Sequence, residues 1–173
     1  MRRLARPDEL PPVIGAPPDE VALVLSAYHS PALAYDATMT VVAVNEAMRA
    51  YIPELVGREP INLLMWLFTM PQAQQFFVDW PTVAENAIAR LRVSWSRFRD
   101  TDPFVPLLDR LCEASTTARH LWQTQATIAV APMVETFRLR DLTGAVREVT
   151  FATLGPIDTP VGLHIVFCVA GWP

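Results

Sequence analysis

The sequence predicts an α+β domain in which a block of helices is inserted between the second and third strands of a five-stranded antiparallel sheet. Three features predict this fold class. Two short β-like runs lie near the N-terminus, apolar residues recur at helical steps through the middle, and the last third is rich in β-branched and aromatic residues. The 173 residues, 51% hydrophobic and 18% charged, suffice for one domain with its own core.

Residues 1–18 are interpreted as a linker that precedes this domain. They are rich in proline and open with a basic cluster, and proline-rich composition forms a semi-rigid spacer. We therefore place the domain at residues 19–173. Asp19 and Glu20 put negative charge in the first turn of its first helix, and Pro31 stops that helix.

A β-hairpin and a capped helix are expected next. Runs of β-like composition at residues 32–35 and 40–44 are joined by Asp36-Ala37-Thr38-Met39, a suitable length for a hairpin turn. Asn45 follows at the junction between strand and helix, where its side chain can cap a helix over residues 46–51. The first two strands are therefore expected to be neighbours in the sheet.

The middle of the chain is predicted to be helical. Thr69 is expected to cap a helix with Pro71 in its first turn. Trp80-Pro81 is expected to interrupt or restart it, because the residue before a proline avoids the helical region. The helix over residues 82–99 carries apolar residues at three- and four-residue steps and is therefore amphipathic.

Two shorter helices and three strands complete the chain. Asp102 is expected to cap a helix that runs through Cys112, and a last helix covers residues 116–124. The three strands are expected at residues 133–140, 145–154 and 161–170. Apolar and polar residues do not alternate cleanly in the middle strand, so its facing is left open. His164 is expected to face opposite to its two neighbours in the last strand.

The sequence offers no candidate for catalysis, metal binding or a cofactor. His29, His120 and His164 are far apart and form no metal-binding motif. With only six glycines the chain has no glycine-rich phosphate loop, and no nucleophile motif is present. The two cysteines are expected to pack in the core of a protein of the reducing cytoplasm.

Charge and hydropathy argue against a nucleic-acid surface and against a membrane span. The net charge is −4, and the 14 basic residues are all arginines scattered along the chain, whereas DNA-binding domains cluster their cations. The longest apolar runs fall far short of the ~20 residues that a spanning helix needs.

Between residues 61 and 122 the chain carries a set of residues in a fixed order and spacing. The set comprises Asn62, Phe68, Pro71, Asp79-Trp80, Leu91-Arg92, Ser115 and Leu121-Trp122. It resembles the ligand-binding domain of MmyB-like bacterial transcription regulators, and the resemblance covers about residues 19–171. The chain departs from that family at Arg140-Asp141, where the family often has His-Pro, and at Gln125, where it often has His.

The resemblance implies a PAS-like fold, a fatty acid or similar apolar ligand between helices and sheet, and an XRE-type helix-turn-helix upstream of the domain. The opening Arg-Arg-Leu-Ala-Arg-Pro resembles the end of such a helix-turn-helix. We therefore expect this chain to lack its own DNA-binding domain, with DNA contact supplied upstream of Met1 or by a partner chain.

Aromatic residues concentrated in the helical middle are candidate walls of a ligand pocket, because pockets combine apolar walls with a few polar anchors. Core packing is the alternative for each of them. Arg92 is a candidate anchor for a carboxylate head group, since its planar guanidinium binds carboxylates through two bonds; a structural ion pair is the alternative. The candidate ligand-binding residues are Trp66, Phe76, Trp80, Leu91, Arg92, Trp95 and Trp122.

Two functions are favoured by the sequence over a third, a small enzyme on the same scaffold, for which the sequence offers no site. The first is a ligand-sensing domain that binds a small apolar or fatty-acid-like effector and passes the change to a DNA-binding element. The second is a module of the same fold with a filled core, which binds no ligand and serves for dimerisation or protein interaction. A homodimer is compatible with both.

Overall fold

The structure is a computed structural model that describes residues 19–56, 60–98, 104–124, 132–141, 143–155 and 162–171. The expected linker at 1–18, the expected cap Asp102 and the departure at Gln125 lie outside the described residues. The elements are α1 (Asp19–Ala27), β1 (Ala32–Tyr35), β2 (Val41–Val44), α2 (Glu46–Tyr51), a 3-10 turn (Pro53–Leu55), α3 (Leu63–Thr69), α4 (Pro71–Phe76), α5 (Trp80–Phe98), α6 (Phe104–Ala114), α7 (Thr116–Thr124), β3 (Val134–Arg140), β4 (Val146–Leu154) and β5 (His164–Ala170).

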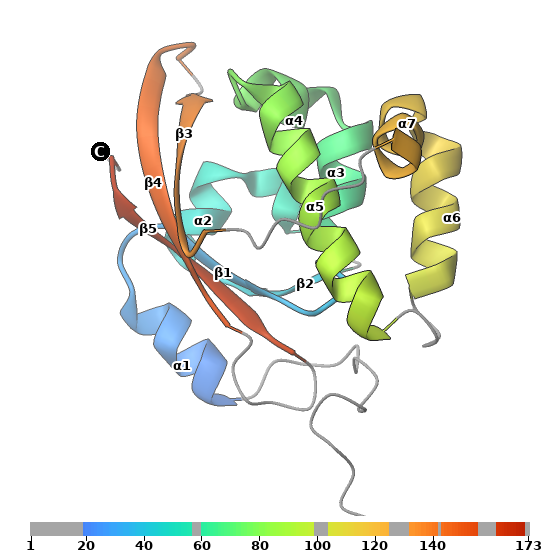
Figure 1. The fold of residues 1–173 in the computed structure, drawn as a ribbon. Coiled ribbons are helices and arrows are strands. Elements are labelled where there is room, and N and C mark those ends of the chain that lie inside the picture. The colour runs from blue at the N-terminus through green and yellow to red at the C-terminus, as the bar shows by residue number, and fades with distance from the viewer. Residues whose placement is uncertain are drawn as a thin grey trace, which may run out of the picture.

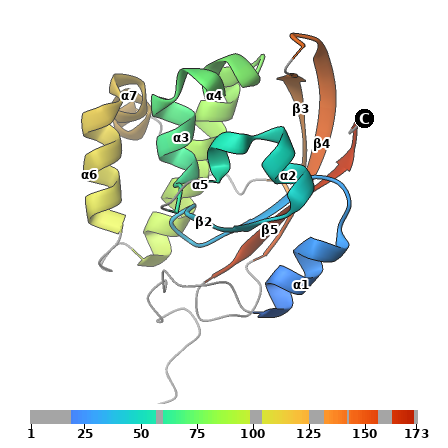
Figure 2. The ribbon, with the colours of Figure 1, turned by 180° about the vertical axis from the view of Figure 1, so that it is seen from behind.

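The five strands form one antiparallel sheet in the order β2-β1-β5-β4-β3, with the helices α2–α7 inserted between β2 and β3. This confirms the α+β, PAS-like fold class. The N-terminal hairpin and the C-terminal strands meet where β1 pairs with β5. Helices α2–α5 lie over one face of the sheet, α6 and α7 pack outside them against α3 and α5, and α1 lies on the other face (Figures 1 and 2). None of the helices in the described ranges combines the length and apolarity of a membrane span.

Alternation along β1 assigns its side chains to two separate cores. Leu33 and Tyr35 pack into the large cluster under the helices, whereas Ala32 and Ala34 pack against α1. In the neighbouring strand His164 stacks on Tyr35, with ring centroids 5.0 Å apart, while Ile165 packs in the α1 core. The expected opposite facing of His164 is therefore confirmed. A register shift between Thr150 and Phe151 interrupts the alternation of β4 and explains its irregular pattern.

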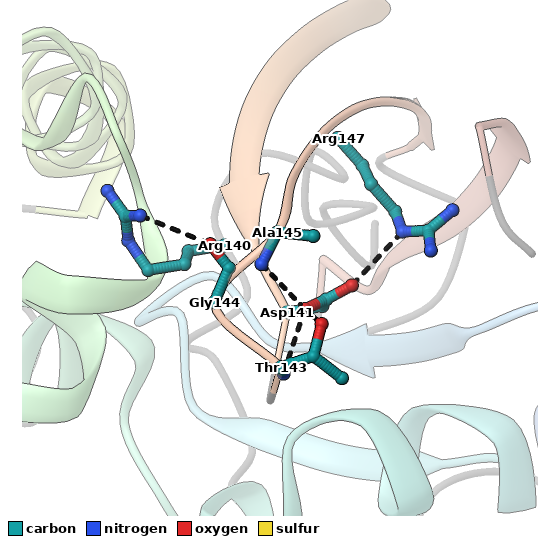
Figure 3. A network of polar contacts seen from close by, with 6 residues as sticks. All are labelled: Arg140, Asp141, Thr143, Gly144, Ala145 and Arg147. Carbon is teal, nitrogen blue, oxygen red and sulfur yellow. Dashed lines mark hydrogen bonds and ion pairs between the residues drawn. The ribbon is translucent and has the colours of Figure 1, made fainter.

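The two hairpins use the same turn. Asp36 begins the β1–β2 turn, and its Oδ1 accepts bonds from the Thr38 amide (2.9 Å), the Thr38 hydroxyl (2.6 Å) and the Thr40 amide (3.0 Å). Asp141 begins the β3–β4 turn, and its Oδ1 accepts from the equivalent three donors at 2.9, 2.6 and 3.0 Å (Figure 3). Each turn needs one residue with positive φ. Gly144 supplies it in the second turn (86°) and Met39 in the first (63°).

The two turn aspartates are expected to respond to pH with opposite signs. Bonds from Thr143 and Arg147 lower the pKa of Asp141 to about 2, so its stabilising effect is complete above the ordinary carboxyl pKa and is lost as the pH falls toward 2. Burial raises the pKa of Asp36, so the stability linked to that group is greatest at low pH and falls as the pH rises through its raised pKa.

Urea unfolding from pH 2 to 6 measures both effects. Asp141→Asn is expected to flatten the fall in the free energy of unfolding between about pH 4 and pH 2. Asp36→Asn is the matched change in the other turn. It is expected to keep the decrease in stability between pH 4 and pH 2, and to lose the separate decrease that occurs as the pH rises through the raised pKa of Asp36. If the free energy of unfolding of Asp141→Asn decreases between pH 4 and pH 2 as steeply as that of the wild type, the lowered pKa of Asp141 is not the cause of the decrease.

Two asparagines begin helices. Asn45 caps α2 as expected, with Oδ1 accepting from the Met48 amide at 2.9 Å. Asn62 caps α3 through the amides of Leu64 and Met65, and its Nδ2 donates to the Thr38 carbonyl at 2.7 Å. Asn62 therefore fixes the start of α3 to the β1–β2 turn.

The expected cap at Thr69 is wrong. Thr69 is the last residue of α3, and its hydroxyl donates to the Met65 carbonyl at 2.6 Å, while Met70 precedes α4 without a side-chain cap. The helix begun by Asn62 occupies this position, so the hydroxyl bonds backwards to the previous turn. The restart expected at Trp80-Pro81 is confirmed, because α4 ends at Phe76 and α5 begins at Trp80, which is itself helical.

Candidate ligand-binding site

A cavity of about 170 Å³ lies between the helix-covered face of the sheet and helices α2–α5. Leu33 and Val166 of adjacent strands form part of its floor, and Leu64, Phe76 and Ala87 represent α3, α4 and α5 in its walls. Its lining is almost entirely apolar. For scale, an engineered apolar cavity of ~150 Å³ holds one benzene molecule. The space therefore fits a compact apolar group or part of an acyl chain.

Aromatic rings in edge-to-face contact build one wall. Trp66 lies 6.2 Å from both Phe76 and Phe77, and Phe77 continues the series to Phe137 on β3 at 5.7 Å. Edge-to-face pairs are favourable and hold the rings in defined positions. The wall is therefore pre-formed, and it joins α3 and α4 to the edge strand of the sheet.

Trp66 brings an unpaired polar atom to this wall. The side chain is 6% exposed and lines the cavity, and within the described part of the chain no group accepts a hydrogen bond from its Nε1. Buried indole N–H groups normally find a partner. Trp80 shows the normal case, because its Nε1 donates to the Leu67 carbonyl at 3.0 Å.

One ion pair lies in the lining. Arg90 on α5 pairs with Glu135 on β3, and their side chains are 19% and 13% exposed, so the pair is largely withdrawn from water. Burial raises the pKa of the Tyr35 hydroxyl, and the nearby charge and hydrogen bond of Arg90 oppose that increase. The pair neutralises its own charges and ties the long helix to the edge strand.

Two of the seven predicted site residues, Trp66 and Phe76, line the cavity. Arg92 points to the other side of α5, where its NH2 donates to the Trp122 carbonyl and its guanidinium lies 4.4 Å from the centre of the Trp122 ring. Trp95 also contacts Trp122, at 5.7 Å between ring centroids. These three residues hold α7 against α5.

Trp80 and Leu91 likewise lie outside the cavity lining, with Leu91 1% exposed in the core. The ligand-binding role of the five residues outside the lining stays a prediction. The two charged residues that line the cavity, Arg90 and Glu135, are not among the residues predicted from the sequence. A signal existed for Arg90, since the lining residues Val83, Asn86, Ala87 and Arg90 follow helical spacing.

A comparison with protein families decides the assignment. A family model described as the MmyB-like transcription regulator ligand binding domain matches residues 17–171. The chain belongs to this family. No curated protein matches the chain. The MmyB-like family is one of regulator ligand-binding domains rather than a class of enzymes, and in the described ranges no three His, Cys, Asp or Glu side chains gather to hold a metal.

In this MmyB-like domain the residues that carried the resemblance mainly position helices. Asn62 caps α3 and Ser115 bonds the Ala118 amide at the start of α7. Trp80 ties α5 to α3, and Arg92 ties α5 to α7. None of the residues that carried the resemblance lines the cavity itself. The motif therefore builds the frame of the ligand-binding domain.

Proposed function

We propose that this domain senses a small apolar or fatty-acid-like molecule by enclosing its hydrocarbon part in the cavity between sheet and helices. One observation carries the proposal: a space of about 170 Å³ is surrounded by apolar side chains in a domain of a ligand-binding family. A filled core would leave no such space, because protein interiors pack with few voids.

Transfer energies make such binding feasible. Each buried methylene contributes about 0.8 kcal/mol, so an acyl chain of about eight carbons contributes roughly 6 kcal/mol before the costs of association. A chain longer than the cavity would extend beyond it or displace a helix. Medium-length chains are therefore the appropriate probes.

The position of the cavity supports a regulatory role. Its walls come from both the sheet and α5, and α5 also carries α7 on its opposite side. A ligand that binds more tightly to one arrangement of α5 than to another shifts the population between them. The shift would then reach the DNA-binding element of the regulator.

Native mass spectrometry and thermal unfolding of the full chain test this proposal. We expect a co-purified lipid-like mass, or a melting temperature that rises with the concentration of octanoate, octanol or octanamide, since a ligand that binds the native state stabilises it. No bound mass and no shift with any of these probes would contradict ligand sensing. A melting temperature that rises with protein concentration instead would favour the dimerisation module.

A further inference from the structure

We infer that the cavity selects an uncharged ligand head group, one with an oxygen that accepts a hydrogen bond from Trp66 Nε1, over a carboxylate on the same chain. The inference rests on the proposed function and names the chemical class of its ligand. Alcohols, amides and esters with a short or medium hydrocarbon chain belong to this class.

The first argument is the unpaired donor. Trp66 is 6% exposed, lines the cavity, and its Nε1 has no acceptor among the described residues. A buried N–H without a partner is unfavourable, and the cost disappears when a ligand oxygen accepts the bond. Since the surrounding wall is aromatic, a ligand oxygen at this point would satisfy Trp66 while its chain contacts Phe76 and Phe77.

The second argument is charge. Arg90 is the one cationic side chain among the described residues that line the cavity, and it is already paired with Glu135. A ligand carboxylate would have to displace Glu135 or enter an apolar space without a counter-charge. Both are costly, because a buried charge that loses its partner remains poorly solvated. A neutral head group avoids this cost and leaves the link between α5 and β3 intact.

The test compares octanol and octanamide with octanoate, which share a chain length and differ in charge. Isothermal titration calorimetry of the full chain at pH 7.5 is expected to show at least about tenfold tighter binding of the neutral probes. Octanoate binding is expected to strengthen as the pH falls toward the range where carboxyl groups take up a proton, because the protonated acid is neutral.

Two variants separate the two arguments. Trp66→Phe keeps an aromatic ring and removes the N–H, and it is expected to weaken octanamide binding about fivefold. Hexane, which has no oxygen to accept a hydrogen bond, is the control probe, and its binding is expected to be nearly the same in Trp66→Phe and in the wild type. Glu135→Gln removes the counter-charge of Arg90. It is expected to raise the affinity for octanoate and so to reduce or reverse the preference for octanol and octanamide over octanoate.

Wild-type protein that binds octanoate more tightly than octanol and octanamide at pH 7.5 would overturn the inference and leave the proposed function standing. A loss of hexane binding in Trp66→Phe equal to the loss of octanamide binding would also overturn it. Absence of binding by all three probes would overturn the proposed function itself. If Glu135→Gln does not fold, the pH dependence of octanoate binding in the wild type decides the charge argument.

Discussion

Replacing Ala87 with phenylalanine is expected to abolish the stabilisation by ligand while leaving the fold intact. Ala87 lies on α5, is 6% exposed and lines the cavity. A phenyl ring at this position would occupy much of a space of about 170 Å³, which is close to the ~150 Å³ that holds one benzene. The variant would thereby fill the cavity with its own side chain and exclude the ligand.

The size of this effect follows from linkage. Ligand at a concentration of 100 times Kd stabilises the native state by about 2.7 kcal/mol. For a domain of this length that corresponds to a rise in melting temperature of roughly 5–10 °C. Thermal unfolding of Ala87→Phe with and without octanol is expected to show no such rise. The melting temperature without ligand is expected to stay close to that of the wild type, because filling a cavity offsets the strain of the larger side chain.

Ala84→Phe is the matched control on the same helix. Ala84 lies one turn earlier, is 0% exposed and does not line the cavity, so the same substitution has no space to occupy. Overpacking of this kind costs typically 1–3 kcal/mol, and we expect the melting temperature without ligand to fall clearly. A full ligand-induced shift in Ala87→Phe would place the ligand elsewhere. Equal destabilisation of both variants would argue that the cavity is closed in solution.

The largest effect on stability is expected from Asn45→Ala. Asn45 is 5% exposed and makes four hydrogen bonds. Its Oδ1 accepts from the amides of Ala32 (3.0 Å) and Met48 (2.9 Å), and its Nδ2 donates to the carbonyls of Tyr28 (2.7 Å) and Ser30 (2.8 Å). One side chain therefore connects the end of α1, the start of β1 and the start of α2.

Removing this side chain deletes a helix cap and leaves several backbone groups without a partner. A lost cap costs about 1 kcal/mol, and each buried group left unpaired adds about 1 kcal/mol or more, so we expect a loss of roughly 3 kcal/mol in the free energy of unfolding. Urea unfolding at pH 7 measures it. Asn45→Asp keeps the acceptor oxygen and loses both donated bonds, and its stability is expected to lie between those of the alanine variant and the wild type. A loss below about 0.5 kcal/mol in Asn45→Ala would show that the four bonds contribute little beyond those made with water.

Elements with strong local signals were predicted well from the sequence. The helix at residues 46–51 and the last helix at 116–124 have the expected bounds. Asn45 caps the first of them, and Ser115 accepts a bond from the Ala118 amide at the start of the second. The strand at residues 32–35 is also confirmed. The helix ending at Thr69 was missed, because the apolar run from Ile61 does not itself show which residue begins it.

The site was predicted less well than the fold. Trp66 and Phe76 line the cavity, but Arg92 lies on the opposite side of α5 from Arg90. Two positions along a helix are about 200° apart, so only one of two such arginines can face the sheet. Periodicity groups residues on a common face but does not say which partner that face meets.

The sequence by itself determined the kind and order of the secondary structure, the family and the apolar character of the helical middle, because these depend on caps, periodicity and composition. Only the tertiary structure decided which aromatic residues surround a space, that Glu135 neutralises Arg90, and that the indole N–H of Trp66 has no acceptor among the described residues. Those features arise where α3, α4 and α5 pack against strands that are distant from them in the sequence. Contacts between such distant segments are set by how whole faces pack, and local sequence signals do not encode that packing.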